Sequence, residues 1–445
     1  MERLVLSKYN QFKVIEDTVI GVNLCNKMLF ALDIDKYDIL TQNATNLENL
    51  KKLNPAFFNA MRKLGVIRDI EFDESFYENS ILKRRIKIFK DPNYRLTINP
   101  TLNCNFSCWY CYETHKKQYM TPSVINSIMK FIERTVCRSD IKQFELDWFG
   151  GEPLLCYETI MKPICKYAKE LCDRENVKLL TTITTNGYLL NRKMIDFFKD
   201  INMQSFQITL DGPKQIHNTI RYTHNHEGSY DRIVKNISLI AKELNPQNLS
   251  LRINYTLKSF DSLFNIAESF PEDVRSGITV LLQPVWQDKV NGDIPISKVE
   301  GLKERFKQAG FKVEIEILHC SDNTTCYADL MNQAVINYDG RVFKCTATDF
   351  EKAKEDGILT EEGDIMWSPS LARKISKATF ENNYCQTCTF LPICFGPCHK
   401  KMLFVANGDD FRKYCYKDGI TETLDYIMRE FKKTGQPLSS LLEYK

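Results

Sequence analysis

Three cysteines lie close together in the chain, at Cys104, Cys108 and Cys111. Cysteine thiolates are the usual protein ligands of iron–sulfur clusters. Three of them on one short loop can bind three irons of a four-iron cluster and leave the fourth iron without a local protein ligand. Such an open iron can bind the amine and carboxylate of an amino acid as a chelate. A structural zinc site is the weaker alternative, because zinc usually has four ligands, commonly in paired Cys-x2-Cys spacing.

A second array of eight cysteines lies downstream of residue 319. Clustered thiols in a cytosolic protein indicate metal ligands rather than disulfides, and eight thiolates are the number that two four-iron clusters need. Two zinc sites are again the alternative. These eight are Cys320, Cys326, Cys345, Cys385, Cys388, Cys394, Cys398 and Cys415. The five scattered cysteines are expected to be small buried apolar side chains: Cys25, Cys137, Cys156, Cys165 and Cys172.

The first motif resembles the hallmark of the radical S-adenosylmethionine (SAM) superfamily, Cys-x3-Cys-x2-Cys, in which an aromatic residue (here Tyr110) precedes the third cysteine. The segment Gly150-Gly151-Glu152-Pro153 resembles the loop that contacts the amino group of SAM, and glycines there let a backbone approach a ligand closely. The resemblance also assigns SAM contacts to Asn186 and Thr209, and pairs Arg221 with the SAM carboxylate.

This resemblance implies a cosubstrate and a reaction. A reduced four-iron cluster donates one electron to the sulfonium of SAM, whose carbon–sulfur bond breaks to give methionine and a 5′-deoxyadenosyl radical. The radical then abstracts a hydrogen atom from the substrate, while the protein positions the cofactor and excludes water. An external electron donor such as flavodoxin or ferredoxin is an implied partner.

The downstream array resembles the SPASM domain, which holds auxiliary four-iron clusters in enzymes that modify peptides and proteins. The resemblance implies two clusters, so that the chain would hold three [4Fe-4S] clusters in all. The first auxiliary cluster would take Cys320, Cys326, Cys345 and Cys398, and the second would take Cys385, Cys388, Cys394 and Cys415. Full ligation by protein implies electron transfer rather than binding of substrate to iron.

The elements that position these motifs are predicted from periodicity. Alternating apolar residues predict six strands with helices between them, near residues 94–98, 144–148, 178–185, 205–210, 249–257 and 278–285. Strands separated by helices indicate an α/β fold with a parallel sheet, and six units are too few for a closed eightfold barrel. We therefore predict a partial (β/α)6 TIM-type barrel with its chemistry at the carboxyl ends of the strands.

Four segments are predicted. Residues 1–90 read as an α+β unit, with strand runs at 5–14 and 19–32 and helices near 36–41, 47–64 and 74–88; it resembles the winged-helix peptide-recognition domain of peptide maturases, and a plain capping domain is the alternative. Residues 91–310 would form the radical SAM partial barrel, residues 311–430 the SPASM domain with its two auxiliary clusters, and residues 431–445 a C-terminal tail.

Two subfamilies compete for the substrate: maturases of ribosomally made peptides, and anaerobic sulfatase-maturating enzymes that form formylglycine. In the sulfatase enzymes, an aspartate that acts as a base directly follows the cysteine that corresponds to Cys345, which here comes five residues after Gly340. Here Thr346 follows Cys345, and the nearest acid is Asp349. We therefore predict a peptide maturase that installs a thioether or carbon–carbon crosslink in a precursor peptide with a leader sequence. An iron–sulfur scaffold or redox sensor is the non-enzymatic alternative.

No catalytic residue is assigned from the sequence. Possible substrate contacts in the barrel mouth are Tyr112, Glu113, Arg252, Asn254 and Gln283, each of which is equally well a structural polar group. The net charge of +3 gives no electrostatic footprint for nucleic acid. No apolar run is long enough for a membrane helix, so we expect a cytoplasmic protein without nucleic-acid or membrane partners.

Overall fold

The computed structural model describes residues 3–288, 294–313, 325–406 and 408–435. The chain divides into two units, each made of separate segments. One unit comprises Met1–Phe89, Ile315–Cys326 and Lys374–Lys445, and the other comprises Lys90–Glu314 and Tyr327–Arg373. The chain passes into the barrel unit after Phe89, next to the predicted boundary between residues 90 and 91. Around residue 310 the division differs from the predicted domains, because residues 327–373 belong to the same unit as the barrel strands.

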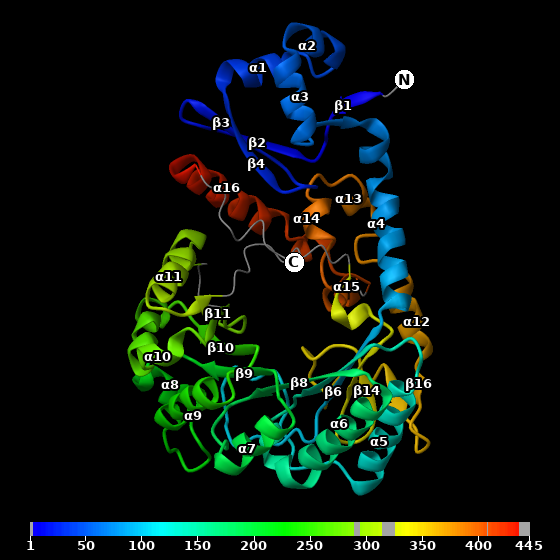
Figure 1. The fold of residues 1–445 in the computed structure, drawn as a ribbon, viewed down its shortest axis with the longest axis vertical. Helices are drawn as coiled ribbons and strands as arrows, with labels where there is room; N and C mark the ends of the chain where they lie inside the picture. Colours follow the sequence, from blue (N-terminus) through cyan, green and yellow to red (C-terminus); the bar gives the residue numbers. More distant parts are fainter. Residues whose placement is uncertain (1–2, 289–293, 314–324, 407, 436–445) are drawn as a thin grey trace. The chain divides into compact units, whose positions relative to one another are not determined.

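The barrel unit is built on a large sheet whose central strands are parallel (Figure 1). The six predicted strands are present as neighbours in sequence order, and all of them pair in parallel. They are β6 (Asn93–Ile98), β7 (Gln143–Trp148), β8 (Lys178–Thr185), β9 (Ser205–Leu210), β10 (Asn248–Tyr255) and β11 (Thr279–Pro284). The prediction of an α/β fold with six parallel βα units is confirmed.

Five further strands extend this sheet at its two ends. The sequence did not reveal them, because runs of two to four residues carry too little periodicity. β12 (Lys312–Val313) pairs in parallel with β11, and β13 (Gln333–Ile336) pairs in parallel with β6. β14 (Arg341–Phe343), β15 (Gly357–Leu359) and β16 (Ile365–Trp367) continue it in antiparallel fashion. The result is a mixed sheet of the partial-barrel type.

Amphipathic helices cover one face of this sheet (Figure 1). In the first of them, Thr121 accepts a hydrogen bond from the backbone N–H of Val124 and Pro122 occupies the first turn, as expected for a helix start. Its inward face buries Ile128 and Ile132 in the core of the unit. The helices are α5 (Pro122–Val136), α6 (Lys162–Glu175), α7 (Arg192–Asp200), α8 (Lys214–Ile220), α9 (Tyr230–Glu243), α10 (Glu272–Arg275) and α11 (Ile296–Gln308). Shorter helical turns are η1 (Pro153–Cys156), η2 (Tyr157–Met161), η3 (Phe260–Ser269) and η4 (Tyr327–Asp329).

In the other unit, the N-terminal segment forms a three-stranded antiparallel sheet followed by helices. Its elements are β2 (Asn10–Ile15), β3 (Thr18–Asn23), β4 (Met28–Asp33), α1 (Ile34–Gln42), α2 (Leu47–Leu53), α3 (Pro55–Lys63) and α4 (Ile70–Lys90), with β1 (Leu4–Leu6) paired to β5 (Ile67–Asp69). The run predicted as one strand, 19–32, is two strands, because the chain turns where Lys27 adopts a left-handed φ of 59°. The helix predicted over 47–64 is interrupted by Asn54, whose side chain caps α3.

Both faces of the β2–β3–β4 sheet are covered within this unit. Val19 and Phe30 pack in one core with Leu50 and Phe58 of the helices α2 and α3. Residues of the opposite face, such as Ile20, belong to a second core formed with α16 (Lys417–Thr434). The unit also contains α12 (Pro369–Ser376, which begins in the barrel unit), α13 (Asn383–Gln386), α14 (Leu391–Cys394), α15 (His399–Ala406) and η5 (Phe411–Tyr414).

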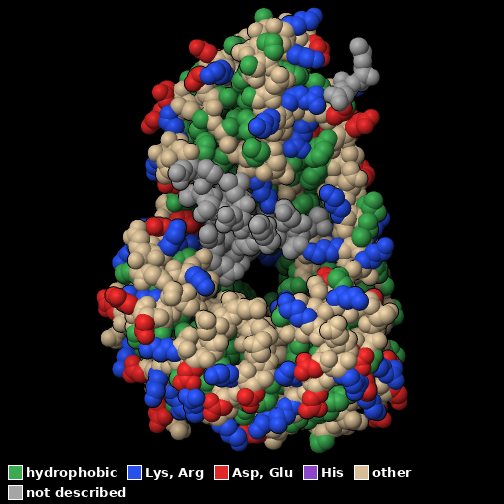
Figure 2. Space-filling model, in the orientation of Figure 1, with side chains coloured by type: hydrophobic (Ala, Val, Ile, Leu, Met, Phe, Trp, Pro, Cys, Tyr) green, Lys and Arg blue, Asp and Glu red, His purple; other side chains and the backbone are tan. Residues whose placement is uncertain are grey.

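All five scattered cysteines had been predicted to be buried, but only three of them are. Cys156, Cys165 and Cys172 lie in the barrel core, as expected. Cys25 is half-buried, and Cys137 is exposed where it ends α5. On the face drawn in Figure 2, basic and acidic side chains are interspersed. Within the described residues, no helix has both the length and the apolarity that crossing a membrane requires.

Candidate functional site

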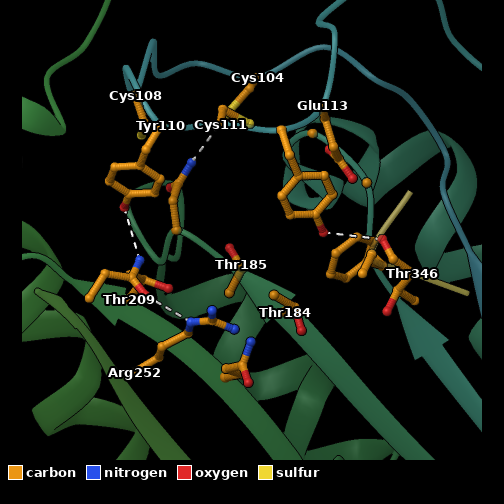
Figure 3. Close-up of a pocket in the computed structure, with 18 of the residues that line it drawn as sticks. Cys104, Cys108, Tyr110, Cys111, Glu113, Thr184, Thr185, Thr209, Arg252 and Thr346 are labelled. Atoms are coloured by element: carbon orange, nitrogen blue, oxygen red, sulfur yellow. Dashed lines mark hydrogen bonds between the residues drawn. The ribbon is translucent and has the colours of Figure 1, made fainter. Parts of the chain in front are cut away.

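A cavity of about 520 Å³ lies in the barrel unit at the carboxyl ends of the parallel strands (Figure 3). Its volume falls in the range typical of small-molecule and cofactor sites. All three cysteines of the first motif line it. All four predicted SAM contacts outside the glycine loop line it as well: Tyr110, Asn186, Thr209 and Arg221. The structure thus brings most of the predicted site together around one space.

The cysteine loop directly follows β6 and turns tightly, with the N–H of Cys111 donating to the carbonyl of Cys108 at 3.1 Å. Cys104 and Cys108 are half-buried, and Cys111 is exposed. Burial raises the pKa of the Cys111 thiol to about 11 and also raises the pKa of Cys108. The thiolate forms therefore need a positive partner, which the irons of a cluster provide. Among the described residues, no group of three or more His, Cys, Asp or Glu side chains is arranged to hold a single metal ion, whereas the thiolates of a cubane each bind a separate iron.

The two glycines after β7 permit a close contact between loops. A Cβ on Gly151 would lie 2.2 Å from the carbonyl oxygen of Asn103, and a Cβ on Gly150 would lie 2.7 Å from that of Thr101. Gly150 also has a left-handed φ of 93°. We expected these glycines to let the backbone approach a ligand. Both line the cavity, but the approach that excludes a side chain is to the backbone of the cysteine loop.

Glu152 is fully buried and holds two loops together. Its carboxylate accepts hydrogen bonds from the N–H of Leu154 (3.0 Å), the hydroxyl of Thr185 (2.7 Å) and the N–H of Asn186 (2.8 Å). Burial raises its pKa, and these hydrogen bonds oppose that shift. Neither Glu152 nor Pro153 lines the cavity. Of the loop that resemblance assigns to the SAM amino group, only the two glycines line the cavity, and the carboxylate of Glu152 fixes the loop after β8 to the loop after β7.

Asn186 connects that loop to the cysteine loop. Its side-chain amide donates to Oδ1 of Asn105 at 2.8 Å and lies 3.9 Å from the sulfur of Cys104. The loops after three successive strands are therefore linked in one chain of contacts, from β6 through β8 to β7.

Tyr110 is the centre of a buried polar network. Its hydroxyl donates to Oδ2 of Asp211 at 2.6 Å and accepts from Arg221 at 2.9 Å and from Asn254 at 3.0 Å. Arg221 also lies 3.6 Å from the same oxygen of Asp211. The arginine that resemblance pairs with the SAM carboxylate is therefore already held by an internal carboxylate, while it still lines the cavity.

His217 supports this network from behind. Its Nδ1 accepts from the N–H of Asp211 at 3.3 Å, so its Nε2 carries the proton and faces the hydroxyl of Ser229 at 2.9 Å. Ser229 in turn donates to the carbonyl of Arg221 at 2.6 Å. Burial, and then the charge of Arg221, lowers the pKa of His217 to about 3. His217 is therefore neutral at physiological pH and serves as a spacer between Asp211 and Ser229.

The strands contribute polar side chains to the cavity that were not predicted from the sequence. Arg95 on β6 pairs with Glu145 at 2.9 Å and with Asp147 at 2.5 Å on β7. Further lining residues from the strands are Thr97, Thr182, Thr184 and Gln207. Barrel interiors are usually filled by branched apolar side chains. The signal was present in the sequence, because polar residues occupy every second position of strands that are otherwise apolar.

Four of the five possible substrate contacts line the cavity, and Gln283 does not: they are Tyr112, Glu113, Arg252 and Asn254. Tyr112 donates its hydroxyl to the carbonyl of Thr346 at 3.1 Å. Glu113 is buried, with one carboxyl oxygen that has no hydrogen-bond partner in the structure. Burial, and then the charge of Asp349, raises the pKa of Glu113 to about 8.

The second predicted auxiliary ligand set lies within the other unit. Burial, with the charges of neighbouring Cys385, Cys388 and Cys415, raises the pKa of the Cys394 thiol to about 12. The amide of Asn382 donates to the sulfur of Cys385 at 3.4 Å. Cys394 is therefore influenced by the other three thiols of the set, and their grouping around one four-iron cluster remains a prediction.

The first predicted auxiliary set is divided between the units. Cys345 belongs to the barrel unit, whereas Cys326 and Cys398 belong to the other. Cys320 lies outside the described residues. The grouping of these four cysteines around one cluster remains a prediction.

Comparisons with known proteins agree with this site. Residues 98–261 match the model of the radical SAM superfamily. The radical SAM cyclopropyl synthase TigE of Paramaledivibacter caminithermalis is 26% identical over 359 residues, which cover 73% of this chain and 72% of that protein. A cysteine-type anaerobic sulfatase-maturating enzyme of Clostridium novyi is 23% identical over 341 residues, covering 70% of this chain and 90% of that enzyme.

Two solved structures share the fold. Native anSMEcpe with bound AdoMet superimposes with a TM-score of 0.57 at 17% identity, covering 76% of this chain and 98% of that one. Streptococcus suis SuiB bound to precursor peptide SuiA gives a TM-score of 0.50 at 15% identity, covering 90% and 97% of the two chains.

Proposed function

Because the chain is a radical SAM enzyme, related over most of its length to sulfatase-maturating enzymes and to maturases of ribosomal peptides, we propose that it oxidatively modifies a ribosomally made precursor peptide. The expected product is a thioether or carbon–carbon crosslink. Such a crosslink removes two hydrogens from the peptide: one atom goes to the 5′-deoxyadenosyl radical, and the other leaves as a proton and an electron. Auxiliary clusters held by the downstream cysteines would accept that electron.

The residues of the cavity fit the cofactors that this family uses. A cluster bound by Cys104, Cys108 and Cys111 supplies the electron that cleaves SAM. Asn186 and the two glycines hold the cysteine loop in place, and Tyr110 ties the same loop to Asp211 and Arg221. We propose that SAM occupies the cavity along these residues, and that Cys385, Cys388, Cys394 and Cys415 hold an auxiliary cluster. The set Cys320, Cys326, Cys345 and Cys398 is proposed for the second.

One observation carries the choice of a precursor peptide. The β2–β3–β4 sheet packs against helices on both of its faces, so that within the described residues only its strand edges are left for a partner. A sheet edge binds an extended peptide as an added strand, through main-chain hydrogen bonds. We therefore propose that residues 1–90 act as a winged-helix-like domain that binds a leader peptide at an edge of this sheet.

The surroundings of Cys345 favour the same choice over a sulfatase substrate. Thr346 lines the cavity, and it stands at the sequence position where sulfatase enzymes have the aspartate that acts as a base. The nearest acid, Asp349, accepts hydrogen bonds from the N–H and hydroxyl of Thr114 and pairs with Lys352 at 3.3 Å. Burial alone would raise the pKa of Asp349, yet these contacts lower it. A carboxylate held in this way is a poor base.

The test begins with a search of the neighbouring genes for a short open reading frame with a leader sequence, and the peptide that it encodes is the substrate. Reconstituted enzyme, SAM and dithionite should release 5′-deoxyadenosine and remove two hydrogens from the peptide, as measured by mass spectrometry. A peptide without its leader should react far more slowly. Conversion of a sulfatase-derived cysteine peptide to formylglycine, with no change in the precursor, would reverse the assignment. Iron without any SAM cleavage would favour the scaffold or sensor.

A further inference from the structure

Arg252 projects a guanidinium into the floor of the cavity. It lies on β10 beside Thr209 of β9, and both residues line the cavity. Its Nε donates to Oδ1 of Asn254 at 2.9 Å. Figure 3 shows Arg252 on the opposite side of the cavity from the cysteine loop. No carboxylate of the described residues pairs with it, which leaves the terminal nitrogens of the guanidinium available to a ligand.

The other charged side chains of the cavity wall are either paired or remain apart from Arg252. Arg95 is neutralised by Glu145 and Asp147, and Arg221 is neutralised by Asp211. Glu113 forms no ion pair with any arginine or lysine that the structure describes. Arg252 is thus the one arginine of the described cavity wall without a counter-ion. A half-buried cation on a cavity wall is stabilised when a partner of opposite charge compensates it.

We propose that Arg252 binds a carboxylate of the substrate. A guanidinium offers parallel donors that match a carboxylate in a bidentate geometry. The carboxylate of SAM is a poor candidate, because chelation of the open iron keeps it at the cysteine loop, across the cavity. The inference rests on the proposed function, and it adds that an acidic side chain or the terminal carboxylate of the peptide lies near the modified residue.

The test uses two pairs of small probes. N-acetyl-glutamate N-methylamide and its glutamine counterpart report on a side-chain carboxylate, and N-acetyl-alanine and its N-methylamide report on a terminal one. Binding to reduced holoenzyme with S-adenosylhomocysteine is followed by the broadening of the probes' NMR signals by the paramagnetic cluster. The acid of at least one pair should bind roughly tenfold or more tightly than its amide, as a charge-assisted hydrogen bond predicts.

Three variants identify the residue. Arg252→Gln should abolish this discrimination, and Arg252→Lys should retain part of it, which also shows that the site is folded. Arg134→Gln, at an exposed ion pair with Asp364, is the matched control and should behave as wild type. Equal binding of acid and amide by wild type, absence of binding by all four probes, or undiminished discrimination in Arg252→Gln would overturn the inference. So would an equal loss of S-adenosylhomocysteine binding in Arg252→Gln, since that would assign Arg252 to the cosubstrate.

These outcomes are separable from those of the proposed function. If the acids are preferred but no peptide is modified, the proposed function fails and the carboxylate site stands with a small acid as its ligand. If acid and amide bind equally while a precursor peptide loses two hydrogens, the function stands and the inference about Arg252 fails.

Discussion

The hydroxyl of Tyr110 donates a 2.6 Å hydrogen bond to Asp211, which joins the cysteine loop after β6 to the end of β9. The same oxygen accepts from Arg221 and Asn254. The hydroxyl therefore uses its one donor and two acceptor positions to bind three residues that are distant from Tyr110 in the sequence. This hydroxyl therefore helps to fix the cysteine loop over the cavity, together with the contacts of Asn186.

Tyr110→Phe should weaken SAM binding and destabilise the barrel unit. The substitution leaves Asp211 and Arg221 buried with fewer partners, which costs about 1–3 kcal/mol. Isothermal titration with SAM and urea unfolding measure the two effects. Tyr119→Phe is the control, because that exposed hydroxyl accepts a single hydrogen bond, from Asn103. Equal behaviour of the two variants would show that the network does not position the loop.

Glu152→Gln should lower SAM affinity by about tenfold or more, because a side-chain amide cannot accept at both ends. Either Asn186 or the pair Leu154 and Thr185 would then face an N–H donor, at a cost of about 1–3 kcal/mol. SAM titration and thermal unfolding report the change. Glu158→Gln, an exposed partner of Lys193, should have little effect on either. Unchanged SAM affinity in Glu152→Gln would contradict the role of Glu152 in joining the two loops.

Gly151→Ala should displace the cysteine loop, since the new methyl group would stand 2.2 Å from the carbonyl of Asn103. We expect loss of SAM binding and a lower yield of reconstituted iron. Gly301→Ala on α11 is the matched control: nothing lies within 4 Å of its added methyl group, and alanine should stabilise the helix by about 0.5–1 kcal/mol. An iron content and SAM affinity equal to wild type in Gly151→Ala would refute the close approach.

Iron analysis after anaerobic reconstitution should give about 12 irons per chain. The triple variant Cys104/Cys108/Cys111→Ala should lose about four of these and all SAM cleavage. The variant Cys385/Cys388/Cys394→Ala should also lose about four, while still binding SAM. Zinc in place of iron, or an unchanged iron content in the first variant, would disprove the cluster assignments.

Stability should fall with acid through His217. Its pKa is about 3 in the folded chain and about 6.5 when unfolded, so the unfolded state takes up the proton first. The contribution of His217 is complete above pH 6.5 and decreases by up to about 1.4 kcal/mol per pH unit below it. Urea midpoints between pH 7 and 5 should fall less steeply in His217→Gln than in wild type. Parallel curves would show that His217 is not held neutral.

The sequence revealed the parts of the fold that repeat or that use rare residue types. The six long strands have apolar alternation and were predicted within a few residues. Cysteine spacing placed Cys104, Cys108 and Cys111 on a loop that does line a cavity. Short strands such as β13 were not predicted, because four residues carry no period that distinguishes them from a loop.

The motifs did not predict the direction in which their side chains point. Glu152 was recognised from its loop, but whether its carboxylate faces the cavity or the protein depends on Thr185 and Asn186, which follow a different strand. The same holds for Arg221, whose partner Asp211 and neighbour Tyr110 come from separate loops. Arg252 was predicted in the barrel mouth and does line the cavity, whereas Arg95 was not predicted there.

The pairing of β13 with β6 has a consequence for how the protein is made. β6 leads directly into the cysteine loop, yet the strand that covers its outer side begins only at Gln333. While the ribosome synthesises the rest of the barrel, β6 remains an open strand edge, which is the kind of surface on which nascent chains aggregate. The order of translation therefore sets a waiting period between the synthesis of the strand that leads into the cysteine loop and the synthesis of the strand that covers its edge.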